Sequence, residues 1–420
     1  MRMTRSLLLV TLLLLSPRVW AQNSPGGSVT PDAAASKAQG ADVLWYGKAP
    51  PGWGGVVGRM KLIASGVGWA ERGGRFYWTT DNGANWTDIT PPSSPGPHER
   101  ISDIFFLDTH RGWALFARYD KDQPQFDLAS TTDAGATWSR TQVTPLPAPA
   151  DYGNPDRSPL GGWGGKIAFA DSLHGWINIS LGGETMNTWW SFLLVTSDGG
   201  RSWKQARHAP SLADADTLLV TASEGWLLGL GEDSPFNVLY VTRDGAHSWQ
   251  QVSVPAPKEV FPATETDYHL PTFSDNLHGN LLVSYAHGVN DSVSEVLFAT
   301  DDGGQTWKTD RMVTNFEDVG SISSTVTDST WIIPSGGSRH PRLTEVGAGA
   351  RIDASNHAAS VFEGRRENAP LSFVSPTEGW IVVGDGELIS TTDGGATWTA
   401  LTPGPQPHVI QPHGSFIPRQ

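Results

Sequence analysis

The sequence contains no cysteine, so the chain can form no disulfide, no thiol nucleophile and no lipid-modified cysteine. Charged residues are also scarce, at 17% of the chain, which is low for a helical protein. Apolar residues outside the N-terminus nowhere follow the spacing of a helix. The 47 glycines and 30 prolines instead divide the chain into many short segments. We therefore expect an all-β protein that folds without covalent cross-links.

Long apolar runs are missing except at the N-terminus. Arg2 and Arg5 precede an apolar run over 7–15, and Ala21 offers a small residue at the expected cleavage edge. This run is shorter than the ~20 apolar residues that span a bilayer. We expect residues 1–21 to be a secretory signal and the protein to be periplasmic or extracellular, without stable membrane insertion.

Composition divides the remaining chain into three parts. Residues 22–40 are rich in small residues and are expected to form a disordered linker, and residues 406–420 form a proline-rich tail. Neither segment suggests a further domain. We expect residues 41–405 to fold as a single large domain.

Acidic residues outnumber basic ones, which argues against nucleic acid as a partner. The formal net charge is −14, and removing Arg2, Arg5 and Arg18 from the 29 basic residues leaves 26 against 43 acidic ones, a net charge of −17. Proteins that bind nucleic acid derive much of their affinity from neutralising phosphates. The charge balance therefore points to other partners.

An eight-residue pattern, T-x-D-x-G-x-x-W, recurs six times and indicates a repeat architecture. In a hairpin, the Asp side chain can accept bonds from the backbone N–H groups after it, and the Gly supplies the positive φ of the turn. The Trp begins the next strand and covers the turn. The copies lie at 79–86, 131–138, 196–203, 242–249, 300–307 and 391–398, with Ala246 replacing the Gly in the fourth.

A second repeat, Gly-Trp or a variant after a short apolar run, occurs seven times. It occurs at 68–69, 112–113, 175–176, 225–226, 279–280, 330–331 and 379–380, on average about every 52 residues. Four-stranded propeller blades are of about this length. The sixth unit has lost the eight-residue pattern, which we call the box, within 336–360. We therefore predict a seven-bladed β-propeller of four-stranded antiparallel blades, which residues 41–46 help to close with an extra strand.

The best copies of the box, T-x-D-G-G-x-[ST]-W at 196–203, 300–307 and 391–398, resemble the Asp-box (BNR) repeat of sialidase-type propellers. Coupled to F-x-x-x-x-x-G-W at 169–176 and 373–380, they look like the photosystem II assembly and stability factors, which are seven-bladed propellers. The resemblance covers nearly all of the chain after the signal. Because sialidases, xyloglucan-cleaving enzymes and sortilin-type receptors share the box, it is specific for the fold and weak for function.

The repeated residues are expected to be structural. Six Asp side chains placed one per blade on outer hairpins cannot converge on one active site. These are Asp81, Asp133, Asp198, Asp244, Asp302 and Asp393. Residues that do not repeat are therefore the candidates for function.

Candidate ligand residues are aromatic and basic side chains outside the repeats. Flat aromatic faces suit sugar rings and apolar peptide side chains, although such residues also cap propeller cores. Loops at the channel mouth are expected to present Trp53, Trp163, Trp189 and Trp190, with Tyr152 and Arg157 in the insertion 145–165 as a lid. A basic group around the missing box, including Arg339, Arg342 and Arg366, is either solvated surface or a site for an anion or acidic partner.

The sequence selects no catalytic residue, no cofactor and no metal site. Glycoside hydrolysis needs two carboxylates ~5 to 10 Å apart, and no motif singles out such a pair. We find no sialidase-type segment with its arginine cluster. We therefore expect an exported, monomeric, non-catalytic scaffold that binds a protein or peptide on its loop face. The alternative is a carbohydrate-active or glycan-binding propeller.

Overall fold

The computed structural model describes residues 56–93, 99–120, 123–143, 163–182, 189–210, 217–231, 234–260, 263, 265–273, 275–286, 293–316, 325–327, 330–335, 342–346, 371–375, 377–383, 386–393 and 397–404. The expected signal, the linker, the strand at 41–46 and the proline-rich tail lie outside these residues. The description below concerns the unit that runs from Tyr46 to Gln420.

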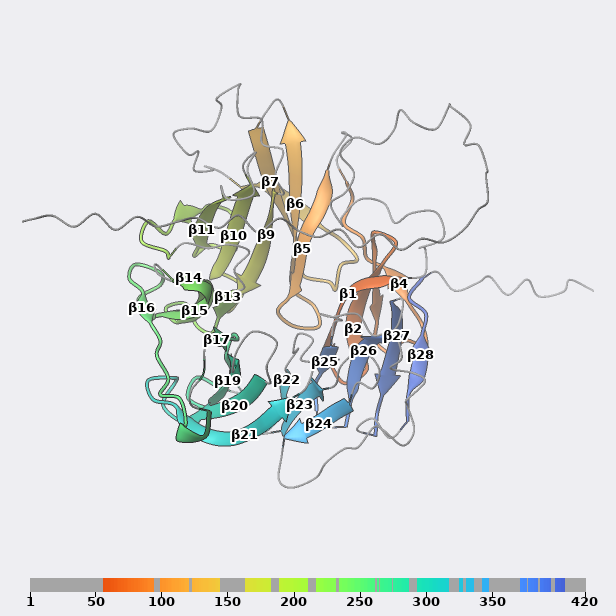
Figure 1. The fold of residues 1–420 in the computed structure, drawn as a ribbon. Coiled ribbons are helices and arrows are strands. Elements are labelled where there is room, and N and C mark those ends of the chain that lie inside the picture. Colours follow the sequence, from red (N-terminus) through yellow and green to blue (C-terminus); the bar gives the residue numbers. More distant parts are fainter. Residues whose placement is uncertain are drawn as a thin grey trace, which may run out of the picture. The chain divides into compact units, whose positions relative to one another are not determined.

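The strands pair in sequence order into antiparallel sheets (Figure 1). The first blade contains β1 (Val57–Ala64), β2 (Val67–Arg72), β3 (Arg75–Thr79) and β4 (Thr87–Asp88). The second contains β5 (Arg100–Phe106), β6 (Gly112–Asp120), β7 (Gln123–Thr131) and β8 (Ser139–Gln142). The third contains β9 (Trp163–Phe169), β10 (Gly175–Gly182), β11 (Trp189–Thr196) and β12 (Lys204–Gln205).

The C-terminal half continues this pattern with two variations. The fourth blade contains β13 (Thr217–Leu219), β14 (Gly225–Gly231), β15 (Ser234–Thr242) and β16 (Gln250–Gln251), and a short 3-10 helix, η1 (Lys258–Val260), follows it. The fifth has a divided innermost strand, β17 (Glu265–Tyr268) and β18 (Thr272–Phe273), followed by β19 (Gly279–Ala286), β20 (Val293–Thr300) and β21 (Lys308–Phe316). The sixth contains β25 (Leu371–Phe373), β26 (Gly379–Val383), β27 (Glu387–Thr391) and β28 (Thr399–Leu401).

The prediction of seven four-stranded blades is wrong. The described residues form a propeller of six blades with four or more strands each, and only a three-stranded sheet lies between the fifth and sixth blades. That sheet contains β22 (Thr325–Thr327), β23 (Thr330–Ser335) and β24 (Arg342–Val346). It belongs to the unit that lacks a box, and hence lacks the side chains that close the hairpin between a third and a fourth strand. Counting Gly-Trp variants overestimated the number of blades.

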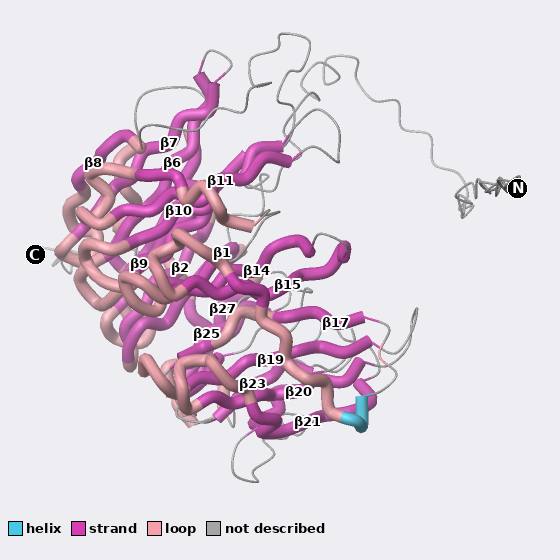
Figure 2. The backbone as a smooth tube through the Cα atoms, turned by 90° about the vertical axis from the view of Figure 1, so that its left-hand side faces the viewer, coloured by secondary structure: helices cyan, strands magenta, loops and turns pink. Residues whose placement is uncertain are grey.

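Aromatic and aliphatic side chains fill the spaces between neighbouring blades. Trp113 of the second blade stacks on Phe169 of the third, with ring centroids 3.7 Å apart. Trp176 of the third packs edge-on against Trp249 of the fourth. The core clusters each combine residues from two adjacent blades, so the Gly-Trp series acts as inter-blade packing. Strands dominate the trace, and η1 is the single helical segment among the described residues (Figure 2).

Each described box hairpin is closed by the same side-chain bonds. In the fifth blade, the Thr300 hydroxyl accepts a 2.9 Å bond from the Gly304 N–H and donates to Asp302. The Asp302 carboxylate also accepts bonds from the Thr306 backbone N–H and hydroxyl. These bonds hold the pKa of Asp302 at about 2. In the fourth copy, Ala246 adopts the glycine conformation, with φ +71°.

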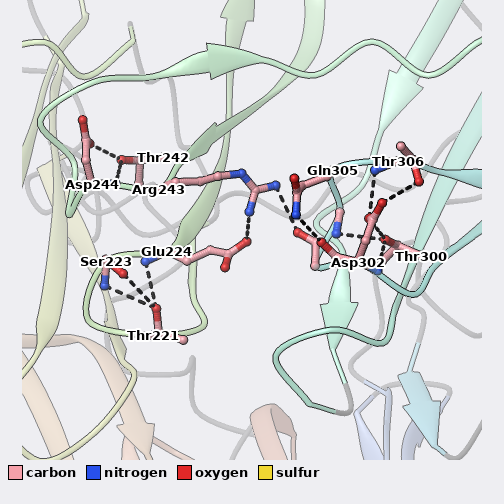
Figure 3. A network of polar contacts seen from close by, with 12 residues as sticks. Thr221, Ser223, Glu224, Thr242, Arg243, Asp244, Thr300, Asp302, Gln305 and Thr306 are labelled. Atoms are coloured by element: carbon pink, nitrogen blue, oxygen red, sulfur yellow. Dashed lines mark hydrogen bonds and ion pairs between the residues drawn. The ribbon is translucent and has the colours of Figure 1, made fainter.

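Side chains near the boxes also join neighbouring blades (Figure 3). The Arg243 guanidinium of the fourth blade forms an ion pair with Glu224 and donates a 3.0 Å bond to the Gly303 carbonyl of the fifth. This contact links two consecutive box hairpins. The boxes therefore order both their own turns and the alignment of adjacent blades.

In the described part of the chain, the first and sixth blades join without exchanging a strand. The Gly66 N–H donates to the Glu378 carboxylate at 2.6 Å, and the Trp380 indole N–H donates to the Asn82 side-chain oxygen at 2.8 Å. The Ser372 hydroxyl bonds the backbone of Leu62. Each of these contacts joins the two ends of the described propeller.

Candidate functional site

The predicted ligand residues fall into two groups. Trp53, Tyr152, Arg157, Arg339 and Arg366 lie outside the described residues. The other four, Trp163, Trp189, Trp190 and Arg342, are described through their backbone alone.

All four residues lie in strands, so the assignment of the three Trp residues to loops is wrong. Trp163 begins β9, Trp189 and Trp190 begin β11, and Arg342 begins β24. Trp163 and Trp190 both pair with Leu181 of β10 and so occupy one row across the third blade. The reason is that Trp suits strands well and extends the pairing of β10 at both its edges. The loops predicted from the sequence included residues at which these strands already begin.

The glycines after Trp163 have a steric role in the packing of β9. A Cβ atom on Gly165 would lie 2.7 Å from the Leu115 side chain and 2.9 Å from the Asn178 carbonyl oxygen. A Cβ on Gly164 would lie 3.1 Å from the Ser102 hydroxyl. The pair therefore lets β9 approach β5 of the preceding blade closely.

A group of charged residues lies on three consecutive innermost strands, at the end opposite the box hairpins. We call this group the innermost-strand cluster. It contains Arg59 of β1, Arg100, Ser102 and Asp103 of β5, and Lys166 of β9, with Glu71 of β2 beside Arg59. The group carries three cations and two carboxylates within an otherwise acidic chain.

Arg59 is the bridge between the first two blades. Its Nε donates to the Glu71 carboxylate at 2.6 Å, and its Nη1 lies 3.8 Å from the Asp103 carboxylate. Nη1 also donates a 3.0 Å bond to the Ser102 carbonyl. The guanidinium lies 5.2 Å from the centroid of the Phe76 ring, within cation–π range. These contacts hold the guanidinium in one orientation.

Asp103 and Ser102 continue the bridge to the third blade. The Asp103 carboxylate accepts 2.9 Å bonds from the N–H groups of Ile104 and Ile167. The Ser102 hydroxyl bonds both the N–H and the carbonyl of Gly165. Burial raises the pKa of Asp103, and the nearby Arg59 and the backbone donors oppose that rise. Adjacent innermost strands are thus joined by side chains.

The sequence held a signal for this cluster that was overlooked. Arg59, Asp103 and Lys166 each stand three residues before the large apolar residue that pairs with the glycine of the Gly-Trp repeat. A charged residue is unexpected in a short apolar innermost strand. Equivalent positions bring the three side chains to neighbouring places on adjacent strands.

A second, partly buried polar group lies on the fifth blade. The His269 ring Nε2 is 3.1 Å from the Ser284 hydroxyl oxygen, and burial lowers the pKa of His269 while Asp267 opposes that shift. No group of three or more potential metal ligands occurs among the described residues. The helices among those residues include none long and apolar enough to cross a membrane.

Comparison with known proteins supports the propeller fold but does not assign the chain to a family. No protein-family model matches the chain, and no curated protein matches it. A solved structure of YCF48 bound to D1 peptide is 19% identical, with a TM-score of 0.41, and the match covers 74% of this chain and 87% of that chain. The GH74 xyloglucanase from Xanthomonas campestris is 12% identical, with a TM-score of 0.38, covering 82% of this chain and 64% of that one.

A third similar structure is a puromycin-hydrolysing peptidase from Mycobacterium tuberculosis. It is 11% identical with a TM-score of 0.50, and the match covers 85% of this chain and 55% of the peptidase. At such identities the similarities concern the fold alone, because one fold carries many functions. Function has to be argued from the site.

Proposed function

We propose that this protein is an exported, non-catalytic propeller scaffold that binds a segment of a protein partner where the innermost strands begin. The innermost-strand cluster is the observation that carries this proposal. Its cations come from three adjacent blades of an otherwise acidic chain, and fixed guanidinium groups bind carboxylates well. The partner segment is therefore acidic.

The carboxylates of the cluster favour binding over glycoside cleavage. A glycosidase places two carboxylates on either side of the scissile bond, with one of them protonated. Glu71 and Asp103 instead converge on the same Arg59 guanidinium. This arrangement balances charge around a fixed cation.

The scaffold role and the export of the protein are proposed from the sequence. Its boxes resemble those of the photosystem II assembly and stability factors, which we take as the nearest functional analogy for a scaffold without catalytic motifs. The apolar run after Arg2 and Arg5 supports export.

Fluorescence anisotropy with a labelled peptide of alternating Glu and Ser tests this function. We expect binding that weakens as salt rises, and a loss of about tenfold in the double variant Arg100→Gln, Lys166→Gln, because charged hydrogen bonds are lost. The matched control is Lys204→Gln, Lys308→Gln, which changes two exposed lysines on outer strands.

Two results would overturn the proposal. One is equal affinity for the Glu peptide and its Gln counterpart at low salt. The other is cleavage of a xyloglucan or other polysaccharide that is abolished by Asp103→Asn, which would favour the carbohydrate-active alternative.

A further inference from the structure

The innermost strand of the second blade, β5, contains a β-bulge at Ser102. The residues on either side of it, Ile101 and Asp103, pair with consecutive residues of β6, and this register skips Ser102. A bulge leaves one residue outside the ladder and redirects its side chain and peptide groups. Ser102 can therefore contact strands other than β6.

The bulge contacts the innermost strands of both neighbouring blades. On one side, the Arg59 guanidinium of β1 donates to the carbonyl oxygens of Ser102 at 3.0 Å and Ile101 at 3.4 Å. On the other side, the Ser102 hydroxyl accepts a 2.7 Å bond from the Gly165 N–H of β9 and donates a 3.0 Å bond to the Gly165 carbonyl. One bulged residue thus joins three consecutive blades.

Lys166 of β9 lies between two residues whose backbone groups are bonded to β5. Ser102 bonds both the N–H and the carbonyl of Gly165, which precedes Lys166. The Asp103 carboxylate accepts a 2.9 Å bond from the N–H of Ile167, which follows it. These bonds fix the backbone of Lys166 relative to β5, while its side chain is exposed and can reach a ligand.

Arg100 of β5 approaches the same stretch of β9. A Cβ atom added to Gly164 would lie 3.6 Å from Nη2 of Arg100 and 3.1 Å from the Ser102 hydroxyl oxygen. The guanidinium therefore lies beside the β9 backbone at Gly164. Because side chains alternate along a strand, Gly164 and Lys166 lie on the same face, about 7 Å apart. The Arg100 guanidinium and the base of the Lys166 side chain are thus one strand repeat apart.

We propose that Ser102 is the positioning residue of the partner-binding site, and that the site selects an extended segment with carboxylates at positions i and i+2. The inference rests on the proposed function, in which Arg100 and Lys166 bind the acidic segment. Alternate side chains of an extended segment lie on one face about 7 Å apart, which matches the repeat between the two cations. Each carboxylate accepts charge-assisted hydrogen bonds from one cation. Ser102 acts through these cations, because its hydroxyl is bonded to Gly165.

Ser372 of β25 provides a matched control for Ser102. Its hydroxyl accepts a 3.1 Å bond from the Leu62 N–H of β1 and donates a 3.3 Å bond to the Leu62 carbonyl. It therefore makes the same pair of bonds between two innermost strands. Ser372 pairs with Trp380 in a regular ladder and joins the last blade to the first. Ser372→Ala thus removes an equivalent inter-blade serine without touching the contact between β5 and β9.

Electron paramagnetic resonance measures the positioning without any peptide. The chain has no cysteine, so spin labels attach only at the introduced Arg100→Cys and Lys166→Cys. The distribution of distances between the labels should broaden with Ser102→Ala. It should stay unchanged with Ser372→Ala and with Ser102→Thr, which keeps the hydroxyl. Equal widths in Ser102→Ala and Ser372→Ala would overturn the inference.

Fluorescence anisotropy with three isomeric peptides then tests the spacing. Each peptide has two Glu residues in a Ser/Thr background, at positions i and i+1, i and i+2, or i and i+3. The parent protein and Ser372→Ala should bind the i, i+2 peptide about tenfold more tightly than the other two, because it alone offers both carboxylates on one face. In Ser102→Ala this preference should fall to about twofold, because the cations are no longer preorganised. Ser102→Thr should restore it.

The two proposals fail in different ways. Absence of binding by every acidic peptide would reject the partner function and the spacing rule with it, while the label distances would still decide whether Ser102 positions the two strands. Salt-dependent binding of acidic peptides, with the same spacing preference in Ser102→Ala as in the parent protein, would reject the inference and leave the partner function intact.

Discussion

His269 is a partly buried, titratable side chain whose charge state depends on its surroundings. Its ring lies against the Ser284 hydroxyl, and burial lowers its pKa below the ordinary value. An unfolded chain therefore binds this proton at a higher pH than the folded chain does. The contribution of His269 to stability is complete above the ordinary histidine pKa and is lost as the pH falls below it.

We expect His269→Gln to reduce the loss of stability between pH 7 and pH 5, since the variant has no proton to bind at this position. Urea unfolding midpoints across this range measure the effect, and His208→Gln, an exposed position, is the control. A parallel loss of stability in His269→Gln and the parent protein would show that His269 does not titrate below its ordinary pKa.

The box hairpin depends on a threonine hydroxyl as well as on its aspartate. Thr300 is buried, and its hydroxyl accepts from two backbone N–H groups while donating to Asp302. The threonine fixes the carboxylate, and the carboxylate fixes the following turn. The repeated Thr at this position of the pattern thus has a physical role equal to that of the Asp.

Thr300→Val keeps the shape of the side chain but leaves the Gly304 N–H without its acceptor. We expect a loss of about 1 to 3 kcal/mol in the free energy of unfolding, the cost of an unsatisfied buried donor. Thr309→Val, at an exposed position of β21, should be nearly neutral. Chemical denaturation of both variants checks this, and equal stabilities would contradict the role of the hydroxyl.

Among the described residues, no strand is shared between the first and last blades, which are joined by side-chain bonds and by one backbone bond from the Val57 N–H to the Gly386 carbonyl. Glu378 reaches from the turn before β26 to the backbone of Gly66 in the first blade. Together with the Trp380 to Asn82 bond, this contact joins residues from opposite ends of the described chain. These polar contacts add to the apolar packing between the same two blades.

Glu378→Ala should lower the free energy of unfolding by about 1 to 2 kcal/mol, because the Gly66 N–H loses its charged acceptor. Glu378→Gln retains an acceptor oxygen and should lose less. Guanidinium unfolding of both variants measures the difference. If Ala and Gln were equally tolerated, the contact would contribute nothing to closure.

The sequence predicted the strands of the complete blades well where the repeats were intact. In the second blade the box at 131–138 was expected to form a turn between two strands, and it joins β7 to β8. Errors arose where the repeat was missing or where a Trp preceded a glycine pair. The three-stranded sheet at β22–β24 lacks a box, and Trp163 begins a strand because its backbone pairs with Leu181.

The sequence by itself determined that this chain builds antiparallel hairpins around repeated boxes, because each box is closed by contacts within about eight residues. Only the tertiary structure decided how many complete blades form and which charges meet. Arg59, Asp103 and Lys166 are far apart in the chain, and their proximity depends on the packing of three blades. The bonds within a box can be predicted from a local sequence pattern. A site formed by neighbouring blades can be predicted only when the relative placement of those blades is known.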